Sequence, residues 1–375
     1  MRYGINPHQQ ARVGDGGPLR VLGGDPSYIN YLDALNAWPL VQEASAALGE
    51  VVAASFKHVS PAGVATAGEL DPAAREAWEL DGPLSDVTSA YLRARDVDPK
   101  SSYGDVIAVS APVDRQLAEI LAGVVSDGIV APGYEPDALA LLAAKKRGSY
   151  LVLEADPAFT PPAWESRDVS GLHLEQETDA AAITPALLRV IEGKPLPPEA
   201  VRDAILGMVT LRYTQSNSVA LLRDGAALGI GAGQQNRVDC VRLAGAKAAV
   251  WWARRHQSTR ELPQVAEMSR QDRFNWQVRW AEGDMTASQW TQFEQLFGKV
   301  AAADGWRERH LAELDGVTLV SDGFLPFRDN IEYAQRAGVR YVVEPGGSIR
   351  SEDVATACAE FGMTLVHTGL RLFHH

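Results

Sequence analysis

Short apolar runs rich in β-branched residues recur along the chain, separated by longer stretches of mixed polarity. Runs of this length, bounded by polar or turn-forming residues, indicate strands that are buried in a sheet. The predicted strands lie at residues 51–56, 106–109, 128–131, 151–153, 219–222, 316–320, 339–343 and 364–367.

Several stretches between these runs repeat their apolar residues at the spacing of an amphipathic helix. The clearest are residues 31–48, 199–211 and 238–255. Alternating strands and helices are typical of α/β layers, in which helices cover a sheet. We therefore predict the α/β fold class.

Proline-rich connectors and one strand-free stretch indicate how these elements are grouped. Residues 156–164 and 193–198 each contain three prolines, which is typical of a connection between elements. Residues 256–312 lack strand signals and are charged, Gln-rich and Trp-rich, as expected of a helical insertion. We predict an N-terminal α/β half at 1–190 and a C-terminal half at 191–375 that contains this insertion.

The composition limits the class of protein. A chain of 375 residues suggests two domains, and a hydrophobic content of 46% is ample for a buried core. No apolar run approaches the ~18 residues of a membrane span, and the N-terminus lacks the apolar segment of a secretory signal. Two cysteines, Cys240 and Cys358, are too few for a disulfide framework. These features predict a cytoplasmic protein that does not bind membranes.

Charge and motif content disfavour several classes of ligand. The net charge of −13 argues against broad nucleic-acid binding, although a few local cations can still attract a small anion into one cleft. The zinc deaminase pattern of H-x-E followed by P-C-x-x-C is absent, so we predict no catalytic metal. A Walker loop is also absent, so we expect no use of ATP.

The first candidate for chemistry is the segment 55–63, which follows a predicted strand. Lys57 and His58 should lie where that strand ends, and open α/β sheets place ligands at strand ends. A lysine beside a histidine offers a cation and a near-neutral base, which suits acid–base chemistry near pH 7. The alternative is a surface lysine and a turn histidine before Pro61.

A glycine-rich segment at 229–237 precedes the helix predicted from Val238. Its three glycines leave backbone N–H groups open to a ligand, and a helix N-terminus favours an anion. The third glycine of a dinucleotide fingerprint is replaced by Gln234, which disfavours dinucleotide binding. The alternative is a tight turn from strand to helix.

Three further segments combine aromatic, glycine and charged residues. The loop at 321–330 has aromatic and polar groups that suit a ring with a polar rim, or phenylalanines that fill the core. Residues 344–348 fit a backbone nest for an anion, or a simple turn. At the terminus, 370–375, Arg371 lies between two leucines and is expected to be a partly buried cation; the alternative is a frayed end.

Taken in order, these segments resemble the AICAR transformylase region of the bifunctional purine-biosynthesis enzyme, from Arg2 to His375. The matching segments are 2–9 (RYGINPHQ), 55–63 (SFKHVSPAG), 101–105 (SSYGD), 125–132 (VSDGIVAP), 213–218 (YTQSNS), 229–237 (GIGAGQQNR), 321–330 (SDGFLPFRDN) and 371–375 (RLFHH). So many ordered matches are highly specific.

The resemblance implies two duplicated cytidine-deaminase-like halves, each with three α/β/α layers, and the helical insertion in the second. It implies a homodimer with active sites shared at the interface. It also implies formyl transfer from the cosubstrate 10-formyltetrahydrofolate to the 5-amino group of AICAR (5-aminoimidazole-4-carboxamide ribonucleotide). A structural potassium ion near residues 214–218 would fit the family, although nothing in the residues requires one.

The resemblance assigns roles to fourteen positions. The catalytic positions are Lys57, His58, Asn217 and Asp329. The positions that contact the nucleotide are Arg2, Tyr3, Gly104, Asp127, Arg237, Phe324 and Arg371, with Arg2 and Arg371 expected at the phosphate because guanidinium groups fork onto phosphate oxygens. The positions on the folate side are Pro326, Phe327 and Asn330.

The chain departs from the family pattern at a few positions. Tyr103 stands where phenylalanine is usual, and Gly323 and Leu325 stand where alanine and phenylalanine are usual. Lys100 occupies a position near the folate pocket that is often uncharged. The IMP cyclohydrolase domain that precedes this region in the common enzyme is missing, so a separate cyclohydrolase would have to close the purine ring if this is the whole gene product.

Two other functions stay open at this stage. The first is a paralogous formyltransferase that acts on another heterocyclic amine ribonucleotide. The second is a non-catalytic partner of a separate cyclohydrolase. Retention of Lys57 and His58 argues against the second.

Overall fold

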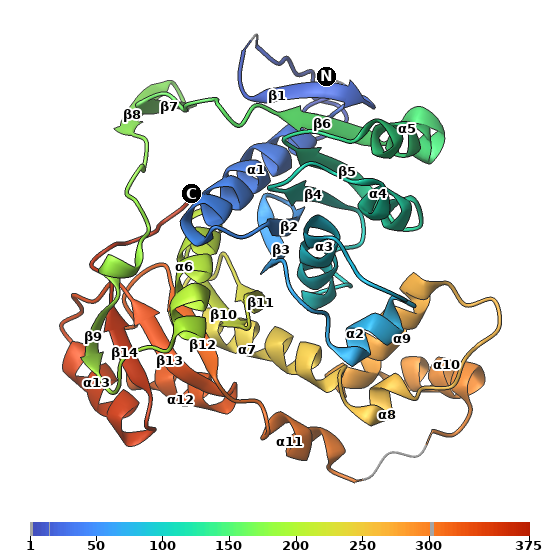
Figure 1. Cartoon of the computed structure of the whole chain (residues 1–375). Helices are drawn as coiled ribbons and strands as arrows, with labels where there is room; N and C mark the ends of the chain where they lie inside the picture. Colours follow the sequence, from blue (N-terminus) through green and yellow to red (C-terminus); the bar gives the residue numbers. More distant parts are fainter. Residues whose placement is uncertain (1–2, 15, 301–303) are drawn as a thin grey trace.

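The computed structural model describes residues 3–14, 16–300 and 304–375, and one 12-stranded sheet organises them (Figure 1). The strand order is β1-β6-β5-β4-β2-β3-β11-β10-β12-β13-β14-β9. Neighbouring strands are parallel within β4–β5–β6 and within β12–β13–β14, and antiparallel elsewhere. The strands are β1 (Leu19–Gly23), β2 (Val52–Lys57), β3 (Ser60–Thr66), β4 (Asp105–Val109), β5 (Ser126–Ala131), β6 (Leu151–Ala155), β9 (Arg189–Glu192), β10 (Val219–Arg223), β11 (Ala226–Gly231), β12 (Val317–Ser321), β13 (Val339–Glu344) and β14 (Thr364–His367).

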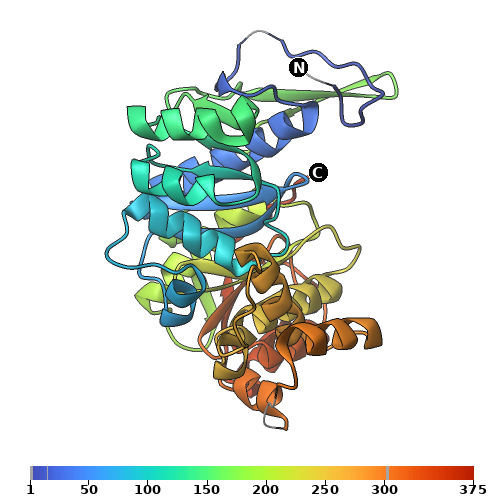
Figure 2. The same cartoon turned by 90° about the vertical axis from the view of Figure 1, so that its right-hand side faces the viewer.

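The two halves of the sheet repeat one order of elements. The first half runs α1-β2-β3-α3-β4-α4-β5-α5-β6, and the second runs α6-β10-β11-α7-β12-α12-β13-α13-β14. In each half an additional strand, β1 or β9, pairs antiparallel with the last strand. The first half (blue to green) lies above the second (yellow to red) in Figures 1 and 2. The predicted α/β fold with duplicated halves is therefore confirmed.

Helices cover both faces of the sheet and create two cores. Alternate residues of a strand point to opposite faces, so Ala53 of β2 joins one core while Val52 and Ala54 join the other. One face is covered by α1 (Tyr28–Leu48) and α6 (Pro198–Arg212), which pack together at the middle of the molecule. The other face is covered by α3 (Asp86–Val97), α4 (Arg115–Ala122), α5 (Pro136–Ala144), α7 (Arg237–Ala253), α12 (Arg328–Arg336) and α13 (Ser351–Glu360). Each half thus has three layers.

The glycine-rich segment 229–237 differs from the predicted ligand loop. Gly229 and Gly231 belong to strand β11, which packs closely against α7. A Cβ atom on either glycine would collide with a carbonyl oxygen of α7. These glycines therefore allow close helix–strand packing, and only Gly233, with φ 68°, lies in the following turn.

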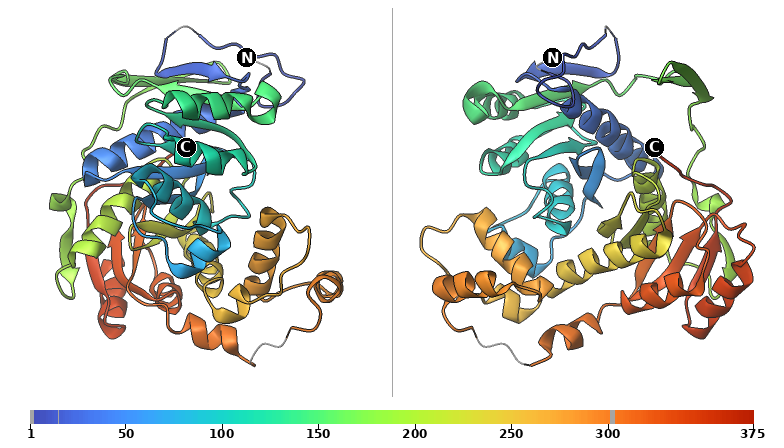
Figure 3. Two further views of the ribbon diagram at one scale, coloured as in Figure 1. Left: turned by 45° about the vertical axis from the view of Figure 1, so that its right-hand side comes forward. Right: turned by 180° about the vertical axis from the view of Figure 1, so that it is seen from behind.

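The second half carries a helical insertion with its own small core. Its helices are α8 (Gln257–Arg260), α9 (Arg270–Glu282), α10 (Ala287–Phe297) and α11 (Trp306–Leu311). The core stacks Trp280 on Phe293, with ring centroids 5.0 Å apart. Both views in Figure 3 show these helices projecting to one side of the sheet. Ion pairs fasten the insertion to the short helix α2 (Pro72–Ala77) and its flanks, among them Arg260–Glu76 at 2.7 Å.

A separate hairpin connects the two halves. Strands β7 (Trp164–Val169) and β8 (Leu172–Glu177) pair only with each other, and every residue of both strands is exposed. The hairpin stands away from the main sheet in Figure 1. Among the described helices, none is long and apolar enough to cross a bilayer.

Candidate functional site

The candidate residues of both halves gather along one edge of the sheet. The β2–β3 register places Lys57 opposite Ser60. The β10–β11 register places Val219 opposite Gly231, and Val219 also faces Ser321 of β12. Since β3 and β11 are antiparallel neighbours, the start of β3 and the end of β11 lie at the same edge. The predicted segments after β2, before β10 and after β12 therefore share this edge.

A first cluster of candidates forms around Lys57 at the end of β2. The Lys57 ammonium donates a hydrogen bond to the carbonyl oxygen of Tyr103. Gly104 and Asp127 lie beside it, because a Cβ atom built on Gly104 would be 3.3 Å from Lys57 Nζ and 4.0 Å from Asp127 Oδ2. Three of the predicted positions, Lys57, Gly104 and Asp127, are thus brought together from β2, the turn before β4, and β5.

His58 lies in the two-residue turn between β2 and β3. It is exposed, and both His58 (φ 54°) and Val59 (φ 59°) adopt left-handed backbone conformations. The Val59 N–H donates to Asp33 Oδ1 on α1 at 2.6 Å. Burial raises the pKa of Asp33 to about 6, while the nearby charges of His58 and Lys57 lower it. The turn that carries the catalytic candidates is therefore tied to helix α1.

The same helix holds part of the predicted nucleotide site at its N-terminus. Ser27 caps α1, and the N–H of Tyr28 donates to the Tyr3 carbonyl oxygen at 3.1 Å. Tyr3 is thereby placed at the end of the helix that also carries Asp33. Arg2 lies outside the described residues.

A pocket of about 400 Å³ opens between the two halves beside this turn. Lys57 and His58 line one wall, and Lys100 and Lys247 also face the pocket. Lys247 is paired with Asp98 at 3.1 Å, and Lys100 with Glu282 at 2.9 Å. The pocket is lined by Lys57, His58, Ser60, Pro61, Ala62, Lys100, Ser101, Ile230, Ala232, Leu243 and Lys247. Its cationic wall suits an anionic ligand.

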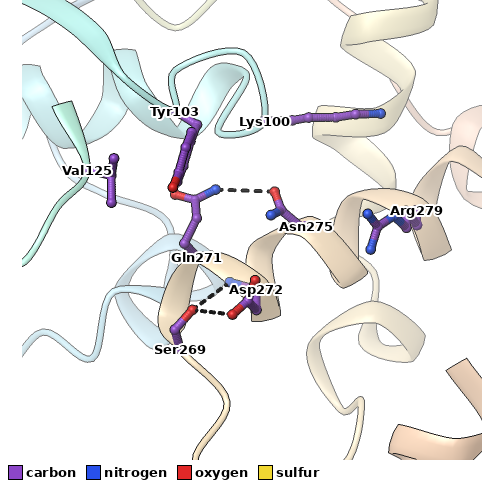
Figure 4. Close-up of a pocket in the computed structure, with 8 residues that line it drawn as sticks. All are labelled: Lys100, Tyr103, Val125, Ser269, Gln271, Asp272, Asn275 and Arg279. Atoms are coloured by element: carbon purple, nitrogen blue, oxygen red, sulfur yellow. Dashed lines mark hydrogen bonds between the residues drawn. The ribbon is translucent and has the colours of Figure 1, made fainter. Parts of the chain in front are cut away.

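A second pocket, of about 410 Å³, lies between the loop before β4 and helix α9 (Figure 4). Lys100 lines both pockets, so the two adjoin. Tyr103 supplies an aromatic wall, and the Gln271 side chain donates to Asn275 Oδ1 at 3.2 Å. An aromatic wall with amide groups suits a polar heterocycle. The sequence-based prediction named neither Gln271 nor Asn275, because the insertion shows no recognisable motif.

A second cluster of candidates surrounds the buried carboxylate of Asp322, at the end of β12. Asp322 accepts hydrogen bonds from Ser216 Oγ at 2.6 Å and from the Ser218 N–H at 3.0 Å. Arg237, at the start of α7, contacts Asp322 Oδ1 at 3.1 Å. Between the two serines, Asn217 donates its side-chain amide to the Gln234 carbonyl oxygen at 2.9 Å. Asn217 and Arg237 thus belong to one network.

The loop at 321–330 presents two phenylalanines to the surface. Phe324 is 43% exposed and Phe327 is 50% exposed, whereas Leu325 is fully buried. The alternative in which the phenylalanines fill the core is therefore wrong, and Leu325 fills it instead. The buried Glu344 accepts the N–H of Leu325 and holds the loop to the end of β13.

The folate-side candidates lie at the start of α12. Asn330 is fully buried and donates to the Phe327 carbonyl oxygen at 2.9 Å and to Asp329 Oδ1 at 3.1 Å. Pro326 is half-buried between the two phenylalanines. These four positions, Pro326, Phe327, Asp329 and Asn330, form one contiguous segment.

Arg371 differs from the partly buried cation that was predicted. It is exposed, and its guanidinium lies 4.5 Å from the centroid of the Phe373 ring. The terminal segment is extended, so its side chains alternate in direction and Leu372 is the one that is buried. Phe373 also lies beside Arg237, at 5.4 Å, so the terminus joins the second cluster. The frayed-end alternative is excluded by the bond from the His374 N–H to Ser216 Oγ at 3.0 Å.

The two clusters remain apart within one chain. Lys57 is on β2 and Asn217 precedes β10, and the order β2-β3-β11-β10 places three strand intervals between them. At about 4.8 Å per interval, the separation is about 14 Å. The strands next to His58 and Asn217 are therefore not neighbours in a single chain.

Two charged residues near the site were missed in the sequence. Lys146, in the 3-10 turn Lys145–Gly148, contacts Asp127 Oδ1 at 3.0 Å. The run of three consecutive cations before β6 is the feature of the sequence that could have indicated Lys146. Asp33 gave a weaker signal, as one acidic residue in an otherwise ordinary helix. In the part of the chain that is described, no group of three or more His, Cys, Asp or Glu residues is arranged to hold a metal ion.

Comparison with known proteins links this chain to a family. The family model described as AICARFT/IMPCHase bienzyme matches residues 1–247. The chain is also 29% identical, over 383 aligned residues, to the bifunctional purine biosynthesis protein PurH of Rhodospirillum rubrum. That alignment covers 100% of this chain and 59% of the relative, so the chain spans about three fifths of the relative's length.

Proposed function

Because the chain belongs to the AICARFT/IMPCHase bienzyme family, an enzyme family of purine biosynthesis, we propose that it formylates AICAR. The formyl group comes from 10-formyltetrahydrofolate, and the products are formyl-AICAR and tetrahydrofolate. The observation that carries the proposal is the Lys57–His58 turn, which borders a cationic pocket beside Gly104 and Asp127. We expect the reaction to take place in the cytoplasm, without a catalytic metal.

Both clusters offer groups that suit parts of the nucleotide. Lys57, Gly104 and Asp127 offer a cation, an open backbone and a carboxylate, which suit the ribose and the reacting amine. In the second cluster Arg237 lies 5.8 Å from the Phe324 ring and is held by Asp322, which suits a flat heterocycle. The exposed Arg371 is proposed for the phosphate, together with Arg2, which lies outside the described residues.

The proposed chemistry needs one base, one acid and oxyanion donors. His58 removes a proton from the 5-amino group of AICAR. The nitrogen of that amino group attacks the formyl carbon, and a new C–N bond forms. Lys57 and the Asn217 amide donate hydrogen bonds to the oxyanion of the tetrahedral intermediate. The bond from carbon to N10 then breaks, and N10 takes a proton from Lys57 and leaves as a neutral amine. Asp329 is proposed to orient the folate beside this centre.

We further propose that two copies of the chain assemble each complete site. The Lys57 and Asn217 clusters lie about 14 Å apart in one chain, too far to act on one carbon atom. In a two-fold symmetric dimer, one residue of the first copy can contact a different residue of the second copy. The first cluster of one chain can therefore meet the second cluster of the other. A homodimer with shared sites would therefore complete the chemistry.

A turnover assay with AICAR and 10-formyltetrahydrofolate tests the proposed function. Wild-type protein should release tetrahydrofolate and accumulate formylated nucleotide. Lys57→Ala should lower kcat by about 100-fold or more, because it removes the proton donor and one oxyanion contact. Lys299→Ala, at an exposed lysine of the insertion, is the matched control and should be unchanged.

The outcomes of this assay separate the candidate functions. No turnover of AICAR by protein that binds the folate would contradict the proposal and direct a screen of other heterocyclic amine ribonucleotides. A protein that binds neither ligand would favour a non-catalytic partner of a cyclohydrolase.

A further inference from the structure

Two hairpin turns at corresponding places in the two halves are tied down in the same way. Asp33 is the sixth residue of α1 and accepts the N–H of Val59, in the β2–β3 turn, at 2.6 Å. Asp203 is the sixth residue of α6 and accepts the N–H of Gly225, in the β10–β11 turn, at 2.7 Å. The two aspartates are 6% and 2% exposed, respectively. Burial is the main cause that raises the pKa of each to about 6.

The two turns differ in the residues that form them. The β10–β11 turn is Asp224–Gly225, with φ values of 54° and 73°. Asp-Gly is a preferred pair for a two-residue hairpin in which both residues have positive φ. The β2–β3 turn has the same backbone form but is His58–Val59, and a β-branched residue at φ 59° is a conformational outlier. The first turn therefore depends on its aspartate far more than the second does.

Of the charged groups near the first turn, Asp33 is the carboxylate that accepts a hydrogen bond from the backbone of the turn. Asp33 on α1 is influenced by the charges of three groups, namely His58 in the turn, Lys57 on β2 and Asp127 on β5. Asp127 is paired with Lys146. On the pocket side Lys100 and Lys247 are paired with acids of their own. Asp33 alone among these groups is buried and bonded to the backbone of the turn.

We propose that Asp33 is a positioning residue of the reaction, which holds the Lys57–His58 turn in the form that presents His58 to the pocket of about 400 Å³. The inference rests on the proposed function, since it treats His58 as the base. The tether itself is shared with the second half, where the Asp224–Gly225 turn carries no candidate side chain. In the first half this scaffold contact has become part of the site.

The two aspartates supply a matched set of variants. Asp33→Ala leaves the Val59 N–H without its acceptor and should lower kcat by about 100-fold with KM changed by less than about 3-fold. Asp33→Asn keeps an acceptor oxygen but removes the charge, so it should retain kcat within about 10-fold. Asp203→Ala and Asp203→Asn should leave kcat and KM unchanged.

A rescue variant tests whether the tether acts through the backbone. Glycine adopts positive φ without strain, so Val59→Gly imitates the Asp-Gly turn of the second half. In the Asp33→Ala background it should restore at least about 10-fold of the lost kcat. Equal losses in Asp33→Ala and Asp203→Ala, or no recovery of kcat in the double variant, would overturn the proposal. If Asp33→Ala does not fold, Asp33→Asn and the rescued double variant still decide it.

A second readout is independent of turnover. Exchange of the Val59 and Gly225 amide protons with solvent deuterium can be followed by NMR in the wild type, Asp33→Ala and Asp203→Ala. Exchange at Val59 should become at least about 10-fold faster only in Asp33→Ala, and unchanged exchange there would contradict the role of Asp33. If AICAR is not formylated by the wild type, the proposed function fails while this measurement still tests the contact.

Discussion

Gly323 illustrates how one absent side chain shapes the second cluster. A Cβ atom at this position would collide with the guanidinium of Arg237, and it would also crowd Phe373. The family resemblance leads one to expect alanine there, which would have to displace the arginine. With glycine, Arg237 can bond to Asp322 and lie between the Phe324 and Phe373 rings. Glycine in place of alanine at position 323 therefore changes where the Arg237 guanidinium lies, and it removes no candidate side chain.

At the same scale, Glu344 predicts how stability depends on pH. Burial raises its pKa to about 7. Because the pKa of Glu344 is higher in the folded state than in the unfolded state, its protonated form stabilises the fold. This stabilisation is fully present below the unfolded-state pKa near 4.3 and is lost as the pH rises through about 7. Glu344→Gln keeps an acceptor for the Leu325 N–H but carries no charge. At pH 8 this variant should have a higher Tm than wild type and a free energy of unfolding that is larger by about 4 kcal/mol at most, and this advantage should vanish at pH 4.

The control for this prediction is Glu177→Gln, at an exposed position of β8. Its Tm difference from wild type should not depend on pH. A Glu344→Gln variant whose Tm difference is the same at pH 4 and pH 8 would contradict the assignment. Thermal melts followed by circular dichroism between pH 4 and 8 give both quantities.

Among the elements, the eight predicted strands all appear, whereas β1, β3, β9 and β11 of the main sheet and the hairpin strands β7 and β8 were not predicted. Central strands of an α/β sheet are apolar throughout, so their signal is strong. Strand β3 begins Ser60–Pro61 and β11 contains two glycines, so both have the composition of a loop. Their pairing is decided by close contact with α3 and α7, which a local pattern does not contain. Strands β1 and β9 lie at the outer edges and are short.

The same contacts predict that two glycines are indispensable for packing. A Cβ atom at Gly63 would collide with the Ala94 carbonyl oxygen of α3, and one at Gly229 would collide with the Ala244 carbonyl oxygen of α7. Backbone atoms cannot rotate aside, so Gly63→Ala and Gly229→Ala should each lower the free energy of unfolding by about 1–3 kcal/mol or more. Urea denaturation measures this loss. Gly14→Ala, at an open position, is the control, and equal midpoints for all three variants would refute the explanation.

For the molecule as a whole, the sequence located the candidate residues but not their grouping. The segments around Lys57 and Asn217 were found as motifs because each follows or precedes an apolar strand. Their division into two clusters depends on the strand order, in which β3 and β11 lie between them. That order arises from duplication, and the two halves share too little local pattern to reveal it. Asp33 and Asp203 have equivalent positions on α1 and α6, and this equivalence is a property of the folded halves that the local sequence does not contain.

Separation of the clusters predicts complementation between two inactive variants. If each site combines the Lys57 cluster of one copy with the Asn217 cluster of its twin, a dimer of Lys57→Ala and Asn217→Ala chains has one intact site. Random pairing of equal amounts should then recover about one quarter of wild-type activity. Co-expression with two different tags and purification through both isolates the mixed dimer. A mixed dimer with no activity would show that each chain builds its own site.

The outer strands of the sheet have a consequence for how the protein behaves at high concentration. A wide sheet with long free edges would be a template for pairing with other molecules. Here the sheet ends at one side in β1 and at the other in β9, which have five and four residues. The pairing of each with its neighbour contains a register irregularity, between Val21 and Gly23 in β1 and between Leu365 and Val366 opposite β9. Short, irregular margins resist edge-to-edge aggregation, so contacts between copies must come from side-chain surfaces and not from extension of the sheet.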